Sequence, residues 1–161
     1  MIVAFTGHRP EKLPWGDNES DPRCQALKIM MERRIRQAVC SGADTFLCGM
    51  ARGCDLMFAE AVLRVREDFP GIRLEAWLPC RSQADGWKQE TRIRYRRILS
   101  RCDAVRLVQD AYTPGCMLRR NRAMTDRADR LISVWDGSEG GTGSTVRYAQ
   151  SQGKPVDGLW L

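Results

Sequence analysis

The feature that most constrains this chain is a regular alternation of short apolar runs with longer segments of helical periodicity. The runs that predict strands are residues 2–6, 45–48, 72–78, 104–108, 131–135 and, at the end, 155–161. The segments that predict helices are residues 23–41, 54–68, 88–101, 116–129 and 146–152. Strands that alternate with single helices form βαβ units, which build a parallel sheet covered on both faces. We therefore predict an α/β fold, a Rossmann-like three-layer αβα sandwich with a mainly parallel sheet of five to six strands.

The length and composition predict one globular domain over residues 1–161. Hydrophobic residues make up 43% of the chain and charged residues 29%, which is ordinary for a folded protein. No apolar run approaches the ~20 residues that a membrane span needs, and the first residues lack a basic leader. We therefore expect no membrane association and a cytoplasmic location. The seven cysteines show no CxxC spacing and there is one histidine, so we expect reduced cysteines, mainly in the core, and no metal site.

Four glycine-bearing turns follow predicted strands, at residues 7–9, 49–55, 109–115 and 136–145. The carboxyl ends of parallel strands share one edge of a sheet, so these turns should lie together. The last three turns lead into predicted helices, whose first N–H groups are free and carry partial positive charge. Glycine allows the main chain to approach a phosphate closely, and Ser and Thr hydroxyls add donors. The arrangement predicts a site for a phosphate-bearing ligand. A flexible surface turn is the alternative for residues 136–145 taken alone.

The net charge of +6, mostly from arginine, agrees with an anionic ligand. It agrees equally well with a nucleic-acid surface or with solubility alone.

Several motifs are similar to those of a known family. Thr6-Gly7-His8-Arg9-Pro10, Cys48-Gly49-Met50-Ala51-Arg52-Gly53-Cys54-Asp55, Arg120-Asn121-Arg122-Ala123-Met124 and the run from Leu131 to Thr142 occur in this order along the chain. Together they resemble the YpsA-like branch of the SLOG superfamily. The superfamily also includes Rossmann-like domains of the DNA-processing protein A type and of the cytokinin-activating phosphoribohydrolase type. The resemblance implies a nucleotide or nucleotide-derived ligand at the sheet edge, without an established reaction for the YpsA-like branch.

One departure from the related phosphoribohydrolases bears on catalysis. Their loop has the pattern PGGxGTxxE, whose last glutamate belongs to the active site. Here Glu139 stands in place of the proline, and Arg147 stands in place of that glutamate. A cation there reverses the electrostatics that a developing oxocarbenium needs, so that reaction by that arrangement is not expected. The catalytic residues stay unknown, although Asp55, Glu60 or Asp136 could supply a carboxylate.

Individual residues in the turns leave two roles open. His8 could contact the ligand or hydrogen-bond its own loop, and Arg9 could clamp a phosphate or form a surface ion pair. Asp55 could cap its helix or contact a ribose hydroxyl, and Arg120 could reach a phosphate or belong to a solvated face. Trp87 and Trp135 fit core or cleft-wall packing, with base stacking as the alternative.

The residues that we expect to contact the ligand lie in these turns and at the helix starts: Gly7, His8, Arg9, Gly49, Arg52, Gly53, Asp55, Arg120, Asn121, Asp136, Gly140, Gly141, Thr142, Gly143, Ser144 and Thr145. The predicted function is binding of a nucleotide or nucleotide derivative, with signalling or regulation as one role. The alternatives are a hydrolase of a nucleotide N-glycosidic or phosphate bond, and a single-stranded DNA-binding protein. No cofactor is identified beyond that nucleotide-type ligand. The sequence leaves the oligomeric state open, including a homodimer.

Overall fold

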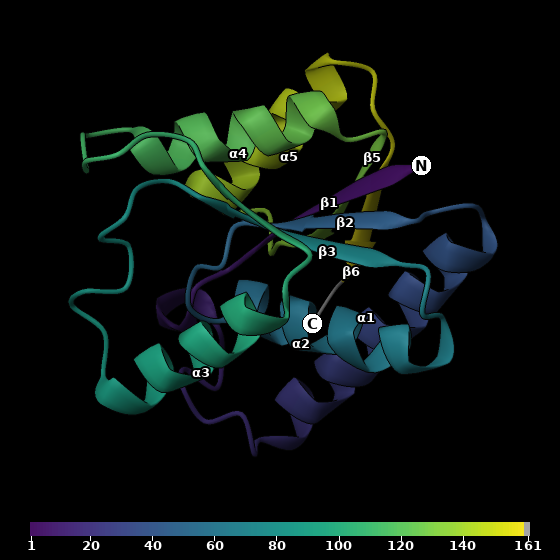
Figure 1. Ribbon diagram of the computed structural model, residues 1–161, viewed down its shortest axis with the longest axis horizontal. Helices are drawn as coiled ribbons and strands as arrows, with labels where there is room; N and C mark the ends of the chain where they lie inside the picture. Colours follow the sequence, from purple (N-terminus) through teal and green to yellow (C-terminus); the bar gives the residue numbers. More distant parts are fainter. Residues whose placement is uncertain (160–161) are drawn as a thin grey trace.

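The computed structural model describes residues 1–159 and contains a six-stranded, all-parallel sheet (Figure 1). The strands are β1 (Ile2–Gly7), β2 (Thr45–Cys48), β3 (Arg73–Leu78), β4 (Ala104–Leu107), β5 (Arg130–Val134) and β6 (Val156–Leu159). Their order across the sheet is β4-β3-β2-β1-β5-β6. The predicted α/β fold is confirmed. The predicted edge strand 155–161 is present as β6, and its residues 160–161 lie outside the described residues.

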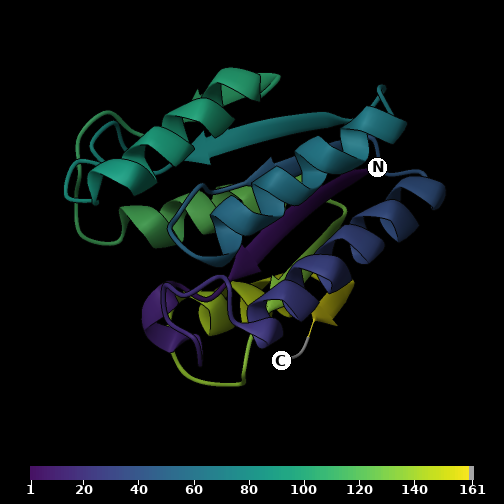
Figure 2. The ribbon, with the colours of Figure 1, turned by 90° about the horizontal axis from the view of Figure 1, so that it is seen from below.

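Five α-helices cover the two faces of the sheet. They are α1 (Pro22–Cys40), α2 (Cys54–Asp68), α3 (Gln89–Arg101), α4 (Cys116–Arg127) and α5 (Gly141–Ser151), with a short 3-10 helix at Pro10–Lys12. Helices α4 and α5 lie together on one face, whereas α1, α2 and α3 cover the other (Figure 1). Figure 2 shows α1, α2 and α3 side by side across the sheet. None of these helices is both long enough and apolar enough to cross a membrane.

The core follows from the alternation of side chains along the strands. Neighbouring residues of a strand point to opposite faces. Val3 and Phe5 of β1 therefore pack toward α1 and α2, while Ala4 packs toward α4 and α5. The ring of Phe5 stacks on that of Phe58 in α2, with the ring centroids 4.2 Å apart. This packing fixes the start of α2 against the end of β1.

The strand order creates a switch point between β1 and β5. From β1 the chain proceeds outward through β2 and β3 to β4, then returns across the sheet to place β5 on the other side of β1. The turns that follow β1 and β5 consequently meet at the carboxyl edge, where the His8 N–H donates to the Val134 carbonyl at 3.3 Å. In open α/β sheets, ligands bind in the crevice at such a switch point.

The structure corrects the predicted start of the last helix. The sequence predicts helix over 146–152, but α5 begins at Gly141. Gly-Thr-Gly-Ser has low intrinsic helix preference, so the helical pattern becomes visible only at Val146. Burial of Thr142, Thr145, Val146 and Ala149 overrides that preference in the folded chain. The first turn of α5 is therefore made by the glycine-rich segment itself.

The cysteines agree in the main with the prediction. All seven are free, and five are buried, while Cys102 is half-buried and Cys40 is exposed.

Candidate functional site

A cavity of about 540 Å³ lies at the switch point. Its walls come from the turn after β1, the segment before α2, the starts of α4 and α5, and the 3-10 helix. The predicted site residues that line it are Gly7, His8, Arg9, Asp55, Arg120, Asn121, Gly140, Gly141, Thr142 and Ser144. Turns that are far apart in the sequence therefore contribute to one cavity, as the parallel sheet requires.

The other six predicted residues do not line this cavity. They are Gly49, Arg52, Gly53, Asp136, Gly143 and Thr145. Three of them support its walls. Gly53 has φ +84°, and a Cβ there would lie 2.8 Å from the His8 carbonyl oxygen. Thr145 Oγ1 donates to the Gly141 carbonyl at 2.8 Å. Asp136 Oδ1 contacts His8 Nε2 and so orients the ring of His8, which lines the cavity.

The first turn of α5 presents free backbone donors. No side chain caps the helix, and Gly140 before it has φ +140°, a conformation that favours glycine. Within residues 1–159, the N–H groups of Gly141, Thr142 and Gly143 have no acceptor. A Cβ built on Gly141 would meet nothing within 4 Å. The backbone donors of this turn therefore border open space in the cavity.

The segment before this helix is fixed by two neighbours. The Trp135 Nε1–H donates to the Ser138 carbonyl at 2.8 Å, so Trp135 packs within the fold beside the cavity, whose lining does not include it. Lys12 Nζ donates to Ser138 Oγ at 3.1 Å and to the Glu139 carbonyl. Gly143 has no room for a side chain, because a Cβ would lie 2.8 Å from the Ser138 carbonyl oxygen. These contacts pre-organise the turn.

His8 joins the two turns at the switch point. Its side chain is 2% exposed, and Nε2 lies 2.8 Å from Asp136 Oδ1 and 3.1 Å from the Asp136 backbone nitrogen. One nitrogen serves one of these contacts at a time: protonated, it donates to the carboxylate, and unprotonated, it accepts from the N–H. The Ser138 hydroxyl and backbone N–H, followed by His8, lower the pKa of Asp136. Nε2 is thus committed to the loop, and Nδ1 is the ring nitrogen left for other contacts.

A buried pair of charged side chains forms the floor of the cavity. Arg120 is 2% exposed, and its Nη1 donates to the carbonyls of Gly49 and, at 3.1 Å, Trp77. Its Nε donates to Asn121 Oδ1 at 2.8 Å. Asp55 is 6% exposed, and its Oδ2 accepts the Ala51 N–H at 3.0 Å. Burial raises the pKa of Asp55 and lowers that of Arg120.

These contacts separate the roles that the sequence left open. Arg120 belongs to the buried floor and not to a solvated face, and Gly49 makes room for it, because a Cβ on Gly49 would lie 2.5 Å from Arg120 Cζ. Asp55 holds the turn before α2. The N–H groups of Ala51 and Cys54 are already used, by Asp55 and by the His8 carbonyl.

Besides the buried Arg120, two exposed cations border the cavity, Arg9 and Lys12. Arg9 is exposed and forms no ion pair with any other residue of the described chain. Lys12 was missed by the sequence analysis, because the contact with Ser138 joins segments 126 positions apart. Pro10 at the first position of the 3-10 helix is the local signal that could have indicated a turn carrying Lys12.

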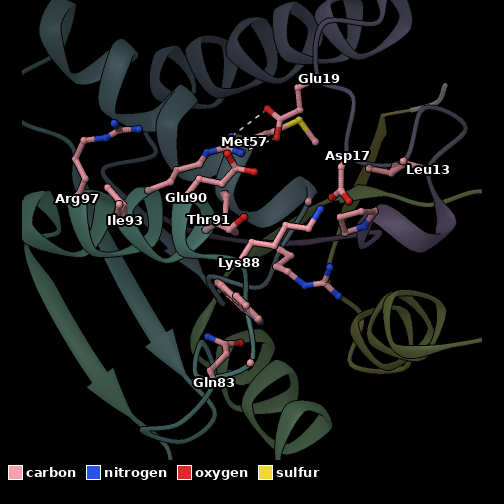
Figure 3. Close-up of a pocket in the computed structure, with 18 residues that line it drawn as sticks. Leu13, Asp17, Glu19, Met57, Gln83, Lys88, Glu90, Thr91, Ile93 and Arg97 are labelled. Carbon is pink, nitrogen blue, oxygen red and sulfur yellow. Dashed lines mark hydrogen bonds and ion pairs between the residues drawn. The ribbon is translucent and has the colours of Figure 1, made fainter.

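A second cavity, of about 730 Å³, lies between the segment 10–19, the start of α2 and residues 83–97 (Figure 3). Of the predicted residues, only Arg52 and Gly53 line it. It is the larger cavity, but its charges are largely paired: Arg94 bonds Glu19, where Figure 3 draws dashed lines, and also Glu60. The carboxylate of Glu90 already occupies the first turn of α3.

Trp87 lines this second cavity and packs edge-on against Tyr95, with the centroids 5.2 Å apart. It is thus remote from the donors of α5. The first turn of α5 has no acidic residue, whereas that of α3 carries Glu90, so the smaller cavity at the switch point suits an anion better and is the candidate site.

The YpsA family model, described as the YspA SLOG family, matches residues 3–155. The chain belongs to this family. The matched range includes every turn and helix start that lines the candidate site. A "UPF0398 protein" of Bacillus anthracis (strain A0248) is 27% identical over 143 residues, which is 88% of this chain and 77% of that protein. The resemblance to the YpsA-like SLOG branch is confirmed.

Solved structures of DNA processing protein A share the fold of this SLOG chain. The protein from Helicobacter pylori, whose structure concerns a single-stranded DNA binding mode, superposes with a TM-score of 0.67 at 20% identity. That from Streptococcus pneumoniae gives a TM-score of 0.62 at 15% identity. The two matches cover 99% and 98% of this chain but 65% and 49% of those proteins. At these identities the likeness shows the fold alone.

Proposed function

We propose that this SLOG-family chain binds a nucleotide or nucleotide-derived ligand in the cavity at the switch point, with a phosphate at the start of α5. One observation carries the proposal: the N–H groups of Gly141 and Thr142, which line a cavity of about 540 Å³, have no acceptor within residues 1–159, and neither has that of Gly143 in the same turn. A helix N-terminus with free donors and a favourable dipole is the standard protein site for phosphate. The exposed guanidinium of Arg9, which has no ion pair among residues 1–159, adds a positive charge at the border of the cavity that can contact the phosphate.

The remaining walls of the cavity suit the rest of a nucleotide. Phe5, Met117 and Leu118 give it an apolar side, which a base can contact. The segment 49–54 offers fewer free donors to a phosphate, because its Ala51 and Cys54 N–H groups are occupied. The seven free cysteines support a cytoplasmic setting for this activity.

The alternatives receive less support from the contacts. Arg147, at the position of the phosphoribohydrolase glutamate, pairs with Glu139 at 3.3 Å and does not line the cavity. Some arginines of α3 and α4 that would suit DNA already have partners: Arg94 bonds two glutamates, and Arg120 bonds backbone carbonyls in the floor of the cavity. Arg94 and Arg120 are therefore not free to contact DNA.

Thermal unfolding with a nucleotide panel tests the proposal. The panel contains AMP, GMP, CMP, UMP, ADP and ADP-ribose, with a single-stranded oligodeoxythymidine as the DNA probe. A ligand at 100 times its dissociation constant should stabilise the fold by about 2.7 kcal/mol. Arg9→Ala should weaken that effect, while Arg33→Ala, which removes another exposed arginine without an ion pair, should not.

Stabilisation by a nucleotide that is lost in the Arg9 variant supports the proposal. Stabilisation by the oligonucleotide alone, or by nothing in the panel, contradicts it.

A further inference from the structure

The floor of the candidate site contains two buried charged groups that each keep one polar atom free. Asp55 uses Oδ2 to accept from Ala51, and Oδ1 has no partner among residues 1–159. Arg120 uses Nε and Nη1, and Nη2 has no partner in the same range. Both residues line the cavity. Neither atom is among the fully enclosed side-chain atoms that lack a partner, so each keeps some accessible surface.

Asp55 is 94% buried and Arg120 is 98% buried. A polar atom that stays without a hydrogen bond on so buried a side chain costs free energy. Asp55 and Arg120 form no direct ion pair among residues 1–159, and both line the same cavity, so a small polar group bound there can contact both of them. A hydroxyl matches this pair, because it donates one hydrogen to a carboxylate oxygen and accepts another from a guanidinium. A phosphate does not match, because the carboxylate would repel it.

The position of Asp55 and Arg120 relative to the phosphate donors indicates how a ligand would lie in the cavity. The start of α2, where Asp55 lies, is joined to the turn after β1 by the Cys54 N–H, which donates to the His8 carbonyl at 3.1 Å. His8 is in turn joined to Asp136, which precedes the glycine-rich segment. The floor and the first turn of α5 therefore lie on either side of the 7–9 turn. A group bound on the floor is a neighbour of the phosphate, as the sugar of a nucleotide is.

We infer that Asp55 Oδ1 and Arg120 Nη2 bind a ribose hydroxyl, so that the site selects ribonucleotides over deoxyribonucleotides. This inference rests on the proposed function, and it adds a sugar-reading element that is separate from the phosphate donors of α5. A buried site built to bond a hydroxyl rejects the analogue that lacks it, because its polar atoms then stay unpaired. Hydrogen bonds to charged groups predict a preference on the order of 10-fold to 100-fold.

Titration calorimetry with matched probes tests the inference. The probes are AMP, GMP, CMP and UMP, each beside its 2′-deoxy and 3′-deoxy counterpart, with ribose 5-phosphate and 2-deoxyribose 5-phosphate as base-free probes. The parent should bind the ribose form about 10-fold to 100-fold more tightly. Asp55→Asn should reduce that ratio toward one. Asp17→Asn, which changes an exposed carboxylate of the other cavity, should keep it.

The outcomes separate this inference from the proposed function. Equal affinity of the parent for the ribose and both deoxyribose forms overturns the sugar selection and leaves nucleotide binding intact. Binding of none of the probes overturns both. The comparison in the parent does not depend on the Asp55 variant, so it decides the inference even if that variant fails to fold.

Discussion

Replacing Gly141 by leucine should separate ligand binding from folding. Gly141 is the first residue of α5, its φ does not require glycine, and a Cβ there would meet nothing within 4 Å. The side chain would extend into the cavity beside the free N–H groups. Because leucine is a better helix former than glycine, stability should stay equal or rise by up to about 1 kcal/mol.

The expected loss of affinity follows from the donors that the side chain blocks. A hydrogen bond to a charged phosphate contributes about 1.5–3 kcal/mol, so blocking one should weaken binding about 10-fold to 150-fold. At 100 times the parent's dissociation constant the parent gains about 2.7 kcal/mol, and a variant bound 100-fold more weakly gains about 0.4 kcal/mol. For a chain of this size these correspond to shifts of about 5–11 °C and about 1–2 °C.

Differential scanning fluorimetry without ligand and with the tightest nucleotide of the panel measures the stability of the free protein and the ligand-induced shift. Gly143→Ala in the same turn should show the opposite effect, a cost in folding, because its Cβ would lie 2.8 Å from the Ser138 carbonyl oxygen. That variant should lose about 1–3 kcal/mol of stability without ligand. A Gly141→Leu protein that keeps the full ligand-induced shift would refute the placement of the phosphate.

Three further predictions concern single contacts. Gly49→Ala should lower the free energy of unfolding by about 1–3 kcal/mol in urea, because its Cβ would displace the Arg120 guanidinium, and an unchanged midpoint would contradict this packing. Arg9→Ala should leave stability within about 0.5 kcal/mol and flatten the salt dependence of nucleotide binding, as calorimetry at two ionic strengths would show. Asp136→Asn should destabilise the protein most near neutral pH. Contacts with Ser138 and His8 lower the pKa of Asp136, so its contribution is present above the unfolded pKa of about 4 and is lost as the pH falls; a pH-independent difference in urea stability would contradict this.

The sequence predicted the fold well because its signals were local. Short runs of mainly apolar residues gave the strands, and helical periodicity gave the helices from α1 to α4 with bounds close to those observed. The start of α5 was wrong because glycine and threonine carry no helical pattern. Packing of Val146 and Ala149 determines that helix start, and packing is not a local signal.

The sequence could predict which turns form the site, because their position depends on the backbone of the sheet. Parallel strands require their following turns to share an edge, and ten of the predicted residues line one cavity there. Side-chain roles were harder, because they depend on long-range fit. Arg120 is buried only because Gly49, 71 positions earlier, leaves space for its guanidinium. Lys12 reaches Ser138 only because β1 and β5 are neighbours.

Two-dimensional amide NMR of the parent protein during titration with AMP, GMP, CMP and UMP tests the central claim most directly. Binding at the switch point should shift the amide resonances of Gly141, Thr142 and Gly143 most, with smaller changes at residues 7–9, because a phosphate would accept from the former directly. Saturable shifts confined to residues 83–94, around the other cavity, would contradict the claim, as would no shift in the first turn of α5.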